Sequence, residues 1–122
     1  MTGTLTALGD THMWLGLKNS DDIGTNFDIR VETFRNGALM SAGETKCVQG
    51  LTCNANQARD VTVLFPAFAA TPFSGTDVLT FRVRTRIGTN ATGGMCGGHS
   101  NAVGARLYFD AVSRLAQVSA TF

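Results

Sequence analysis

Two kinds of side chain in this 122-residue sequence could bind a ligand by contact alone, without a catalytic step. Aromatic rings offer flat apolar surfaces against which the C–H face of a sugar can stack. Arginine guanidinium groups donate paired hydrogen bonds to hydroxyl, carboxylate or sulfate groups. The residues that could form such a binding platform lie at every second position in three segments. They are His12, Trp14, Arg82, Arg84, Arg86, Arg106 and Tyr108.

This platform depends on strict alternation, because successive side chains of a strand point to opposite faces of a sheet. Trp14 and Tyr108 then lie opposite a face of Leu, Val and Phe. They share a surface with the arginines if all these strands belong to one sheet. The alternative interpretation is structural: Asp28 and Glu32 pair with the arginines across strands, and Trp14 lies beneath a loop. The sequence supports both interpretations.

A second candidate site is a turn rich in oxygen ligands, which Ca²⁺ prefers. The run from residue 19 partly imitates the start of an EF-hand loop. However, Ile23 replaces a ligand and Arg30 stands in the place of the closing Glu, so an EF-hand is excluded. We expect either a calcium site of another kind or a solvated turn whose Asp side chains accept hydrogen bonds from backbone N–H groups. The candidate calcium ligands are Asn19, Asp21, Asp22 and Asp28.

Three cysteines, Cys47, Cys53 and Cys96, allow either one disulfide with one thiol left over or three free thiols. The spacing alone does not select the pair, because Cys96 could reach either of the other two. A disulfide persists in oxidising compartments and is rare in the cytosol. One disulfide among the three therefore favours a location outside the cytosol.

The two carboxylates Asp28 and Glu32 are the nearest approach to the acid pair of a glycoside hydrolase. On one strand they would lie about 13 Å apart, at ~3.3 Å per residue. That exceeds the separations of roughly 5–9.5 Å that such catalysis uses. The two histidines, His12 and His99, lie far apart in the sequence, and nothing marks an activated nucleophile. We therefore expect no enzymatic activity.

The elements that must position these residues are short strands. Period-2 alternation of apolar residues recurs along the chain, whereas sustained 3.6-residue periodicity does not. Asn36-Gly37 between two strand-like runs predicts a tight hairpin, because both residues tolerate positive φ. Residues 88–104, with six glycines among seventeen, predict a long loop. We expect one helical turn at residues 54–59 and strands at residues 5–8, 12–18, 27–34, 38–42, 45–48, 59–65, 78–87, 105–110 and 117–122.

Composition limits the class of protein. Hydrophobic residues make up 43% of the chain and charged residues only 16%, and Thr, Val, Phe and Gly are plentiful. A net charge of +1 provides no strong field to recruit nucleic acid, and no apolar run approaches the ~20 residues that span a bilayer. We expect one domain, residues 1–122, folded as an antiparallel β-sandwich of about eight strands, jelly-roll or immunoglobulin-like. A small closed β-barrel is the alternative.

Three segments carry a resemblance to a known class of module. Residues 14–22 (WLGLKNSDD), followed by residues 27–32 (FDIRVE), resemble the strand, polar turn and alternating strand of extracellular bacterial β-sandwich modules. Residues 106–113 (RLYFDAVS) are similar to the closing strand of jelly-roll carbohydrate-binding modules. The chain as a whole looks like uncharacterised domains of secreted bacterial proteins. This resemblance implies a β-sandwich placed outside the cell and often appended to a larger secreted polypeptide.

These observations together predict a non-catalytic accessory binding module of a secreted or cell-surface protein of bacterial origin. The expected ligand is carbohydrate, either a polysaccharide or another glycan, and calcium is the one candidate cofactor. The alternative is a structural or assembly module, such as a spacer, an adhesin stalk or a filament subunit. Such a protein would self-associate through sheet edges, and residues 117–122 are the segment it could exchange.

Overall fold

The computed structural model describes residues 2–66, 68–89, 92, 94–97, 101–108 and 119–122. Within them the chain is all-β, with ten strands and two short 3₁₀-helices, η1 (Ser20–Asp22) and η2 (Ala55–Gln57). The strands pair in an antiparallel manner in four sheets, and none of these sheets closes into a barrel. The strands are β1 (Gly3–Leu5), β2 (Ala7–Leu8), β3 (Thr11–Leu17), β4 (Phe27–Arg35), β5 (Ala38–Val48), β6 (Arg59–Val63), β7 (Thr71–Phe73), β8 (Leu79–Ile87), β9 (Ala105–Tyr108) and β10 (Ala120–Thr121).

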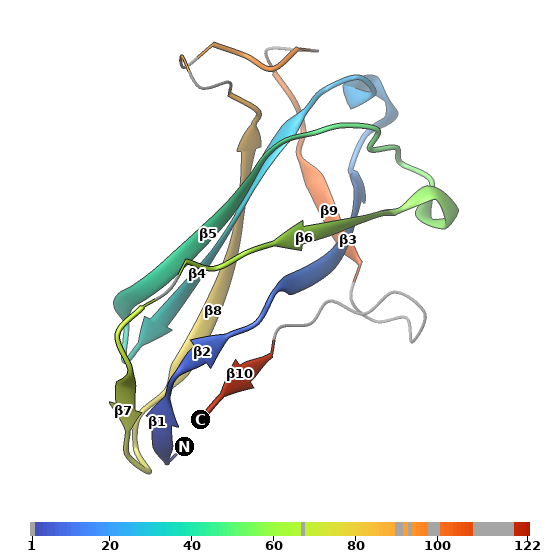
Figure 1. The fold of residues 1–122 in the computed structure, drawn as a ribbon. Helices are drawn as coiled ribbons and strands as arrows, with labels where there is room; N and C mark the ends of the chain where they lie inside the picture. The colour runs from blue at the N-terminus through green and yellow to red at the C-terminus, as the bar shows by residue number, and fades with distance from the viewer. Residues whose placement is uncertain (1, 67, 90–91, 93, 98–100, 109–118) are drawn as a thin grey trace.

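Two three-stranded sheets form most of the molecule, one in the order β5-β4-β8 and the other in the order β6-β3-β9 (Figure 1). The alternation predicted from the sequence directs one side of each sheet inward, and the two inner sides share a single hydrophobic core. Burying a large apolar side chain contributes roughly 1.5–3 kcal/mol, so this core dominates the stability of the fold. Its buried members are Met13, Leu15, Leu17, Phe27, Ile29, Val31, Val48, Leu51, Val61 and Val63.

The hairpin between β4 and β5 turns at Asn36-Gly37. Arg35 lies opposite Ala38 in the register, so the loop has two residues. Asn36 has φ 50° and Gly37 has φ 82°, which is the left-handed pair that a two-residue turn matching the strand twist requires. The hairpin prediction is therefore confirmed.

Strand β5 is one long strand, although the sequence predicts two separate ones. The segment that joins them contains Gly43, whose backbone lies directly against the Leu64 carbonyl group. A side chain at residue 43 would overlap that carbonyl, so glycine allows β5 to continue past the end of β6. Two residues further along, Thr45 Oγ1 donates a hydrogen bond of 2.6 Å to the Thr62 carbonyl oxygen and links the edges of the two sheets.

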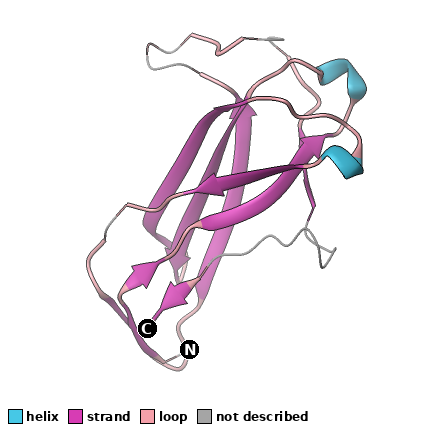
Figure 2. Ribbon diagram, turned by 45° about the vertical axis from the view of Figure 1, so that its right-hand side comes forward, coloured by secondary structure: helices cyan, strands magenta, loops and turns pink. Residues whose placement is uncertain are grey.

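Two smaller sheets, β1-β7 and β10-β2, lie at the end of the molecule where both termini are found (Figure 1). The two 3₁₀-helices lie away from this end, as Figure 2 shows. The sequence does not predict β7, because Pro72 interrupts its pattern. Proline is tolerated here because, among the described strands, β7 pairs only with β1 and is an edge strand.

The two predicted strands nearest the C-terminus are described only in part. Strand β9 is described to Tyr108, and the remainder of the predicted strand, residues 109–110, lies outside the described residues. The same holds for residues 117–118 of the predicted last strand. Its described end forms β10, which pairs with β2 of the same chain.

Candidate functional site

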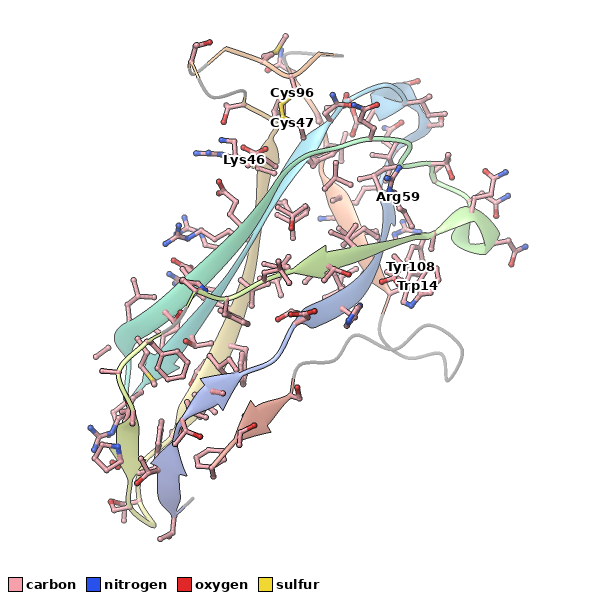
Figure 3. All side chains as sticks on the ribbon, in the orientation of Figure 1. Trp14, Lys46, Cys47, Arg59, Cys96 and Tyr108 are labelled. Carbon is pink, nitrogen blue, oxygen red and sulfur yellow. A yellow bond between two sulfur atoms is a disulfide. The ribbon has the colours of Figure 1, made fainter. Side chains whose placement is uncertain are left out.

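The outer side of the β6-β3-β9 sheet brings two aromatic residues from distant parts of the chain together. Trp14 of β3 lies directly opposite Tyr108 of β9 in the antiparallel register. Their neighbours Met13 and Leu15 point into the core, so alternation directs Trp14 outward. Both aromatic side chains are half-buried, and Figure 3 shows them next to each other at the end of β9.

The position of Tyr108 depends on a glycine. A Cβ atom placed on Gly16 would lie 2.9 Å from Cε2 and 3.1 Å from the hydroxyl of Tyr108, so the ring passes over the Gly16 backbone. The same Cβ would lie 2.9 Å from the Thr52 carbonyl oxygen. Glycine at residue 16 therefore provides the space in which the tyrosine ring lies on the sheet. The buried Tyr108 hydroxyl accepts and donates no hydrogen bond among the described residues.

Polar side chains continue this surface along β3 and β6. His12 Nδ1 lies 3.2 Å from Thr62 Oγ1 and 3.8 Å from a carboxylate oxygen of Asp60. Asp60 lies opposite Trp14, and its side chain is 48% exposed. Arg106, which is exposed, lies on β9 opposite Gly16. We call this surface the aromatic face and define it by His12, Trp14, Asp60, Thr62, Arg106 and Tyr108.

Asp60 and Thr62 are absent from the platform predicted from the sequence. Their alternation with Val61 and Val63 is visible in the sequence and does place them on an outer side. What the sequence does not provide is the pairing of β6 with β3, which brings them beside His12 and Trp14.

The arginines of β8 do not belong to the aromatic face, and this corrects the expected single platform. Arg82, Arg84 and Arg86 lie on the outer side of the β5-β4-β8 sheet, on the opposite side of the core. The physical reason is that alternation fixes the side of a strand on which a residue lies but not the sheet to which the strand belongs. We call this second surface the charged face and define it by Asp28, Arg30, Glu32, Glu44, Lys46, Arg82, Arg84 and Arg86.

Cross-strand pairing dominates the charged face, as the structural interpretation of the sequence proposes. Glu32 accepts a hydrogen bond of 2.9 Å from Arg82 Nε and one of 3.2 Å from Arg30 Nε. Asp28 accepts a hydrogen bond of 2.9 Å from Arg86 Nε, and Lys46 Nζ lies 3.6 Å from the same carboxylate oxygen. Both carboxylate side chains are almost fully covered, at 1% exposure for Asp28 and 6% for Glu32.

These contacts lower the pKa values of both carboxylates. Burial alone would raise the pKa of Asp28. Hydrogen bonds from the Cys47 N–H, from Arg86 and from Thr89 outweigh burial and lower that pKa from 3.8 to about 2. The hydrogen bond from Arg82 is the largest influence on Glu32 and lowers its pKa, against the opposing effect of burial. Both groups are therefore ionised at neutral pH and bind their partners as anions.

Three of the four candidate calcium ligands have other partners. Asn19 caps η1 by accepting a hydrogen bond from the Asp21 N–H at 2.9 Å. The buried Asp22 accepts a hydrogen bond of 2.8 Å from the Val103 N–H and ties the end of the glycine-rich loop to η1. Asp28 belongs to the charged face. The capping interpretation thus describes Asn19 and Asp22, and the four residues do not form one cluster.

The three cysteines form one disulfide and leave one free thiol. Cys47 pairs with Cys96, with a Cα–Cα distance of 5.7 Å, and Cys53 is free and exposed. The disulfide attaches the glycine-rich loop to β5 at the end of the charged face (Figure 3). Asp28, Cys47 and Cys96 are the one group among the described residues whose ligand atoms lie close enough for a metal ion, within 4.8 Å. The disulfide occupies both sulfur atoms, and Asp28 already accepts several hydrogen bonds, so this group does not fit a metal.

The C-terminal strand has its partner within the same chain. The Thr6 N–H donates to the Thr121 carbonyl oxygen at 2.8 Å, and the Gly9 N–H donates to the Ser119 carbonyl oxygen at 2.7 Å. The Phe122 ring contacts Phe73 edge-on, with ring centroids 5.9 Å apart. These contacts hold the described part of the predicted exchange segment against its own sheet.

Comparisons of this chain with known proteins identify no relative. The chain matches no protein-family model, no curated protein and no solved structure. Among the described residues no helix is long and apolar enough to cross a membrane.

Proposed function

We propose that this chain is a non-catalytic carbohydrate-binding module of a secreted or cell-surface protein, and that it binds its glycan on the aromatic face. The single observation that carries this proposal is the directly opposed pair Trp14 and Tyr108 on the outer side of the β6-β3-β9 sheet. Two aromatic rings on neighbouring strands provide a continuous apolar strip, whose flat surfaces suit the C–H faces of sugar rings.

The polar residues around the strip suit the hydroxyl groups of the same ligand. Asp60 accepts hydrogen bonds, His12 and Thr62 both donate and accept, and Arg106 donates a fork of hydrogen bonds. In the register, His12 and Thr62 lie on one side of the Trp14–Tyr108 pair and Arg106 lies on the other, while Asp60 lies opposite Trp14. A sugar stacked on the rings would therefore find hydrogen-bond partners along its edges.

Two further observations support the proposed setting. The two three-stranded sheets that share one core agree with the β-sandwich that the resemblance to extracellular bacterial modules implies. The Cys47–Cys96 disulfide is stable in an oxidising compartment and supports a place outside the cytosol. An extracytoplasmic binding module of a bacterial polypeptide fits both.

The fluorescence of Trp14 tests the proposal directly, because Trp14 is the sole tryptophan of the chain. Soluble oligosaccharides of cellulose, xylan, mannan and chitin should be titrated in turn, and the corresponding insoluble polysaccharides used in pull-down assays. We expect one of these series to shift the emission of Trp14 with a saturable dependence on concentration. Titrations without any response in all four series, with no retention on the solids, would contradict carbohydrate binding by these sugars.

Variants then locate the site. Trp14→Ala should abolish retention on the polysaccharide that binds, because the stacking surface is lost, whereas Trp14→Phe should keep part of it. Lys18→Gln is the matched control, since Lys18 is exposed at the end of β3 and lies outside the aromatic face. If Trp14→Ala binds as tightly as the unmodified protein, the aromatic face is not the binding site.

A further inference from the structure

The charges of the charged face alternate in sign, with one exception. Strand β4 carries alternating charges, and each of its two carboxylates lies directly opposite an arginine of β8. The arginine between those carboxylates, Arg30, lies opposite another arginine, Arg84. Like charges in directly opposite positions destabilise a sheet, so an acidic residue is what the pattern calls for at residue 84. The three register pairs are Asp28–Arg86, Arg30–Arg84 and Glu32–Arg82.

Among the three arginines of the charged face on β8, Arg84 also lies farthest from a carboxylate. Its nearest carboxylate is Glu32, with Nη1 and Oε1 3.8 Å apart. Glu32 already accepts closer hydrogen bonds from Arg82 and from Arg30. The neighbours of Arg84 on the same face of β8 are Arg82 and Arg86, both cations, and the Arg84 side chain is 60% exposed. Its guanidinium therefore has N–H donors available to a ligand.

The whole charged face has a surplus of positive charge. Five cationic side chains share it with three carboxylates, so two positive charges are not matched by a carboxylate. The cations are Arg30, Lys46, Arg82, Arg84 and Arg86, and the carboxylates are Asp28, Glu32 and Glu44. The surplus is largest around Arg84, because Asp28 and Glu32 are hydrogen-bonded to other cations and Glu44 lies 3.8 Å from Lys46 and from Arg86.

The surface is hollowed at the same place. A depression of about 340 Å³ lies over the middle of the sheet. Its cationic lining comes from Arg30 of β4 and from Arg84 and Arg86 of β8, and Thr85, between these two arginines, also lines it. Two arginines on neighbouring strands thus face one concave space, and each is exposed enough to turn its guanidinium toward it. The remaining lining residues are Asp28 and Glu44.

We propose that this depression binds one oxyanion, a sulfate or carboxylate group, between the guanidinium groups of Arg30 and Arg84. A bound anion would supply the negative charge that the alternating pattern lacks at this point. It would convert a like-charge contact into two charge-assisted hydrogen-bonded pairs, which arginine forks form with planar and tetrahedral oxyanions. The proposal does not depend on the aromatic face, which lies on the other side of the core.

Inorganic sulfate is the first probe. Its titration into ¹⁵N-labelled protein should be followed on the arginine Nε–Hε signals, with chloride adjusted to keep the ionic strength constant. We expect saturable shifts at Arg84 and Arg30. Arg84→Gln should weaken the apparent dissociation constant about tenfold or more, because a charged hydrogen-bond donor is removed. Arg84→Lys keeps the charge but loses the fork, so its affinity should lie between the two.

The control variant is Lys18→Gln, which removes the same formal charge from an exposed residue outside both faces. It should leave the sulfate affinity unchanged, which separates a local site from a general effect of net charge. Shifts that grow linearly with sulfate, or equal losses in Arg84→Gln and Lys18→Gln, would overturn the proposal. Arg84 is exposed, so we expect Arg84→Gln to fold; a dispersed amide spectrum verifies this.

The source of the oxyanion is tested by a second set of probes. Tri-galacturonate provides carboxylates and a sulfated galactose oligomer provides sulfates, and a neutral galactose oligomer of equal length is the reference. A lower dissociation constant for either acidic oligomer than for inorganic sulfate assigns the site to an acidic polysaccharide. If inorganic sulfate and the acidic oligomers bind with equal affinity, the site is assigned to the free ion. If the neutral oligomer binds as tightly as the acidic oligomers, the proposed oxyanion site is overturned.

The two proposed sites can fail separately. Trp14→Ala should leave the sulfate titration unchanged, and Arg84→Gln should leave the fluorescence response of Trp14 to a neutral oligosaccharide unchanged. If sulfate binds and no neutral sugar does, the aromatic face alone is refuted. If a neutral sugar binds and sulfate does not, the depression at Arg84 alone is refuted.

Discussion

The charged face and the aromatic face are each the outer side of a three-stranded antiparallel sheet. They differ in the hydrogen bonds and ion pairs between their side chains. On the charged face, two nearly buried carboxylates are hydrogen-bonded to arginines of two strands. On the aromatic face, the one ion pair among the described residues is the 3.8 Å contact between His12 and Asp60. The difference indicates that charges on the first face mainly stabilise the fold, whereas the second face has fewer ion pairs among the described residues.

Removing a buried carboxylate is the strongest test of this contrast. Asp28→Ala would leave Arg86, Lys46 and the Cys47 N–H without their shared acceptor, at a position only 1% exposed. Breaking a buried, hydrogen-bonded ion pair in this way typically destabilises a protein by about 3–5 kcal/mol. We expect urea denaturation to show a loss of that size. Asp21→Ala, which removes an exposed carboxylate, should change the free energy of unfolding by about 0.5 kcal/mol or less.

Acid should weaken the same face. The pKa of Asp28 is about 2 in the folded protein and ordinarily 3.8, so its contribution to stability is complete above pH 4–5. That contribution is lost as the pH falls through about 2, because the folded protein must then bind a proton that breaks these contacts. The loss attributable to Asp28 is about 2 kcal/mol. The lowered pKa of Glu32, on the same face, acts in the same direction.

Urea denaturation at a series of pH values between 7 and 2 measures this effect. Asp28→Asn should be less stable at pH 7 and should lose less stability on acidification than the unmodified protein. An equally steep loss of stability in both proteins would show that Asp28 is not the group that titrates.

On the aromatic face, the position of one ring can be changed without altering any charge. Gly16→Ala places a Cβ 2.9 Å from the Tyr108 ring and 2.9 Å from the Thr52 carbonyl oxygen, so the ring must move. Overpacking of this kind destabilises proteins by roughly 1–3 kcal/mol. We expect the larger consequence to be weaker binding of the glycan, because Tyr108 would no longer lie beside Trp14.

Thermal unfolding and the Trp14 fluorescence titration together measure the two consequences. Gly75→Ala is the matched control, because a Cβ there meets its nearest atom at 3.7 Å. Unchanged glycan affinity in a folded Gly16→Ala variant would remove Tyr108 from the proposed site.

The sequence predicts which side of each strand a residue occupies and does not predict how distant strands pair. Alternation correctly separates Met13 and Leu15 from Trp14, and Asn36-Gly37 correctly predicts the hairpin. These are local properties, fixed by neighbouring residues. The pairing of Trp14 with Tyr108 joins residues far apart in the chain, and nothing local specifies it.

The same limit explains the other differences between the predicted and the observed site. The sequence predicts the arginines of β8 beside Trp14, but they lie across the core, because β8 pairs with β4. The sequence does not select the disulfide partner of Cys96. Cys47 lies 49 residues away in the chain, and only the whole fold brings the two cysteines together. The carboxylates that meet the arginines were visible in the sequence, since Asp28 and Glu32 share one side of β4.

The smallest expected effect is a change in the stability of the charged face. It tests the contrast between the faces most specifically, because this variant should be more stable, whereas the variants above should be less stable. Arg84→Glu completes the alternating pattern by placing a carboxylate opposite Arg30 and between Arg82 and Arg86. Exposed cross-strand pairs contribute about 0.2–1 kcal/mol, so we expect this variant to be more stable by about 0.5 kcal/mol at low salt. The gain should shrink as sodium chloride is added, because exposed charges are screened. Sulfate should no longer bind to this variant, and a variant that is less stable than the unmodified protein would mean that Arg84 is held by contacts the alternating pattern does not include.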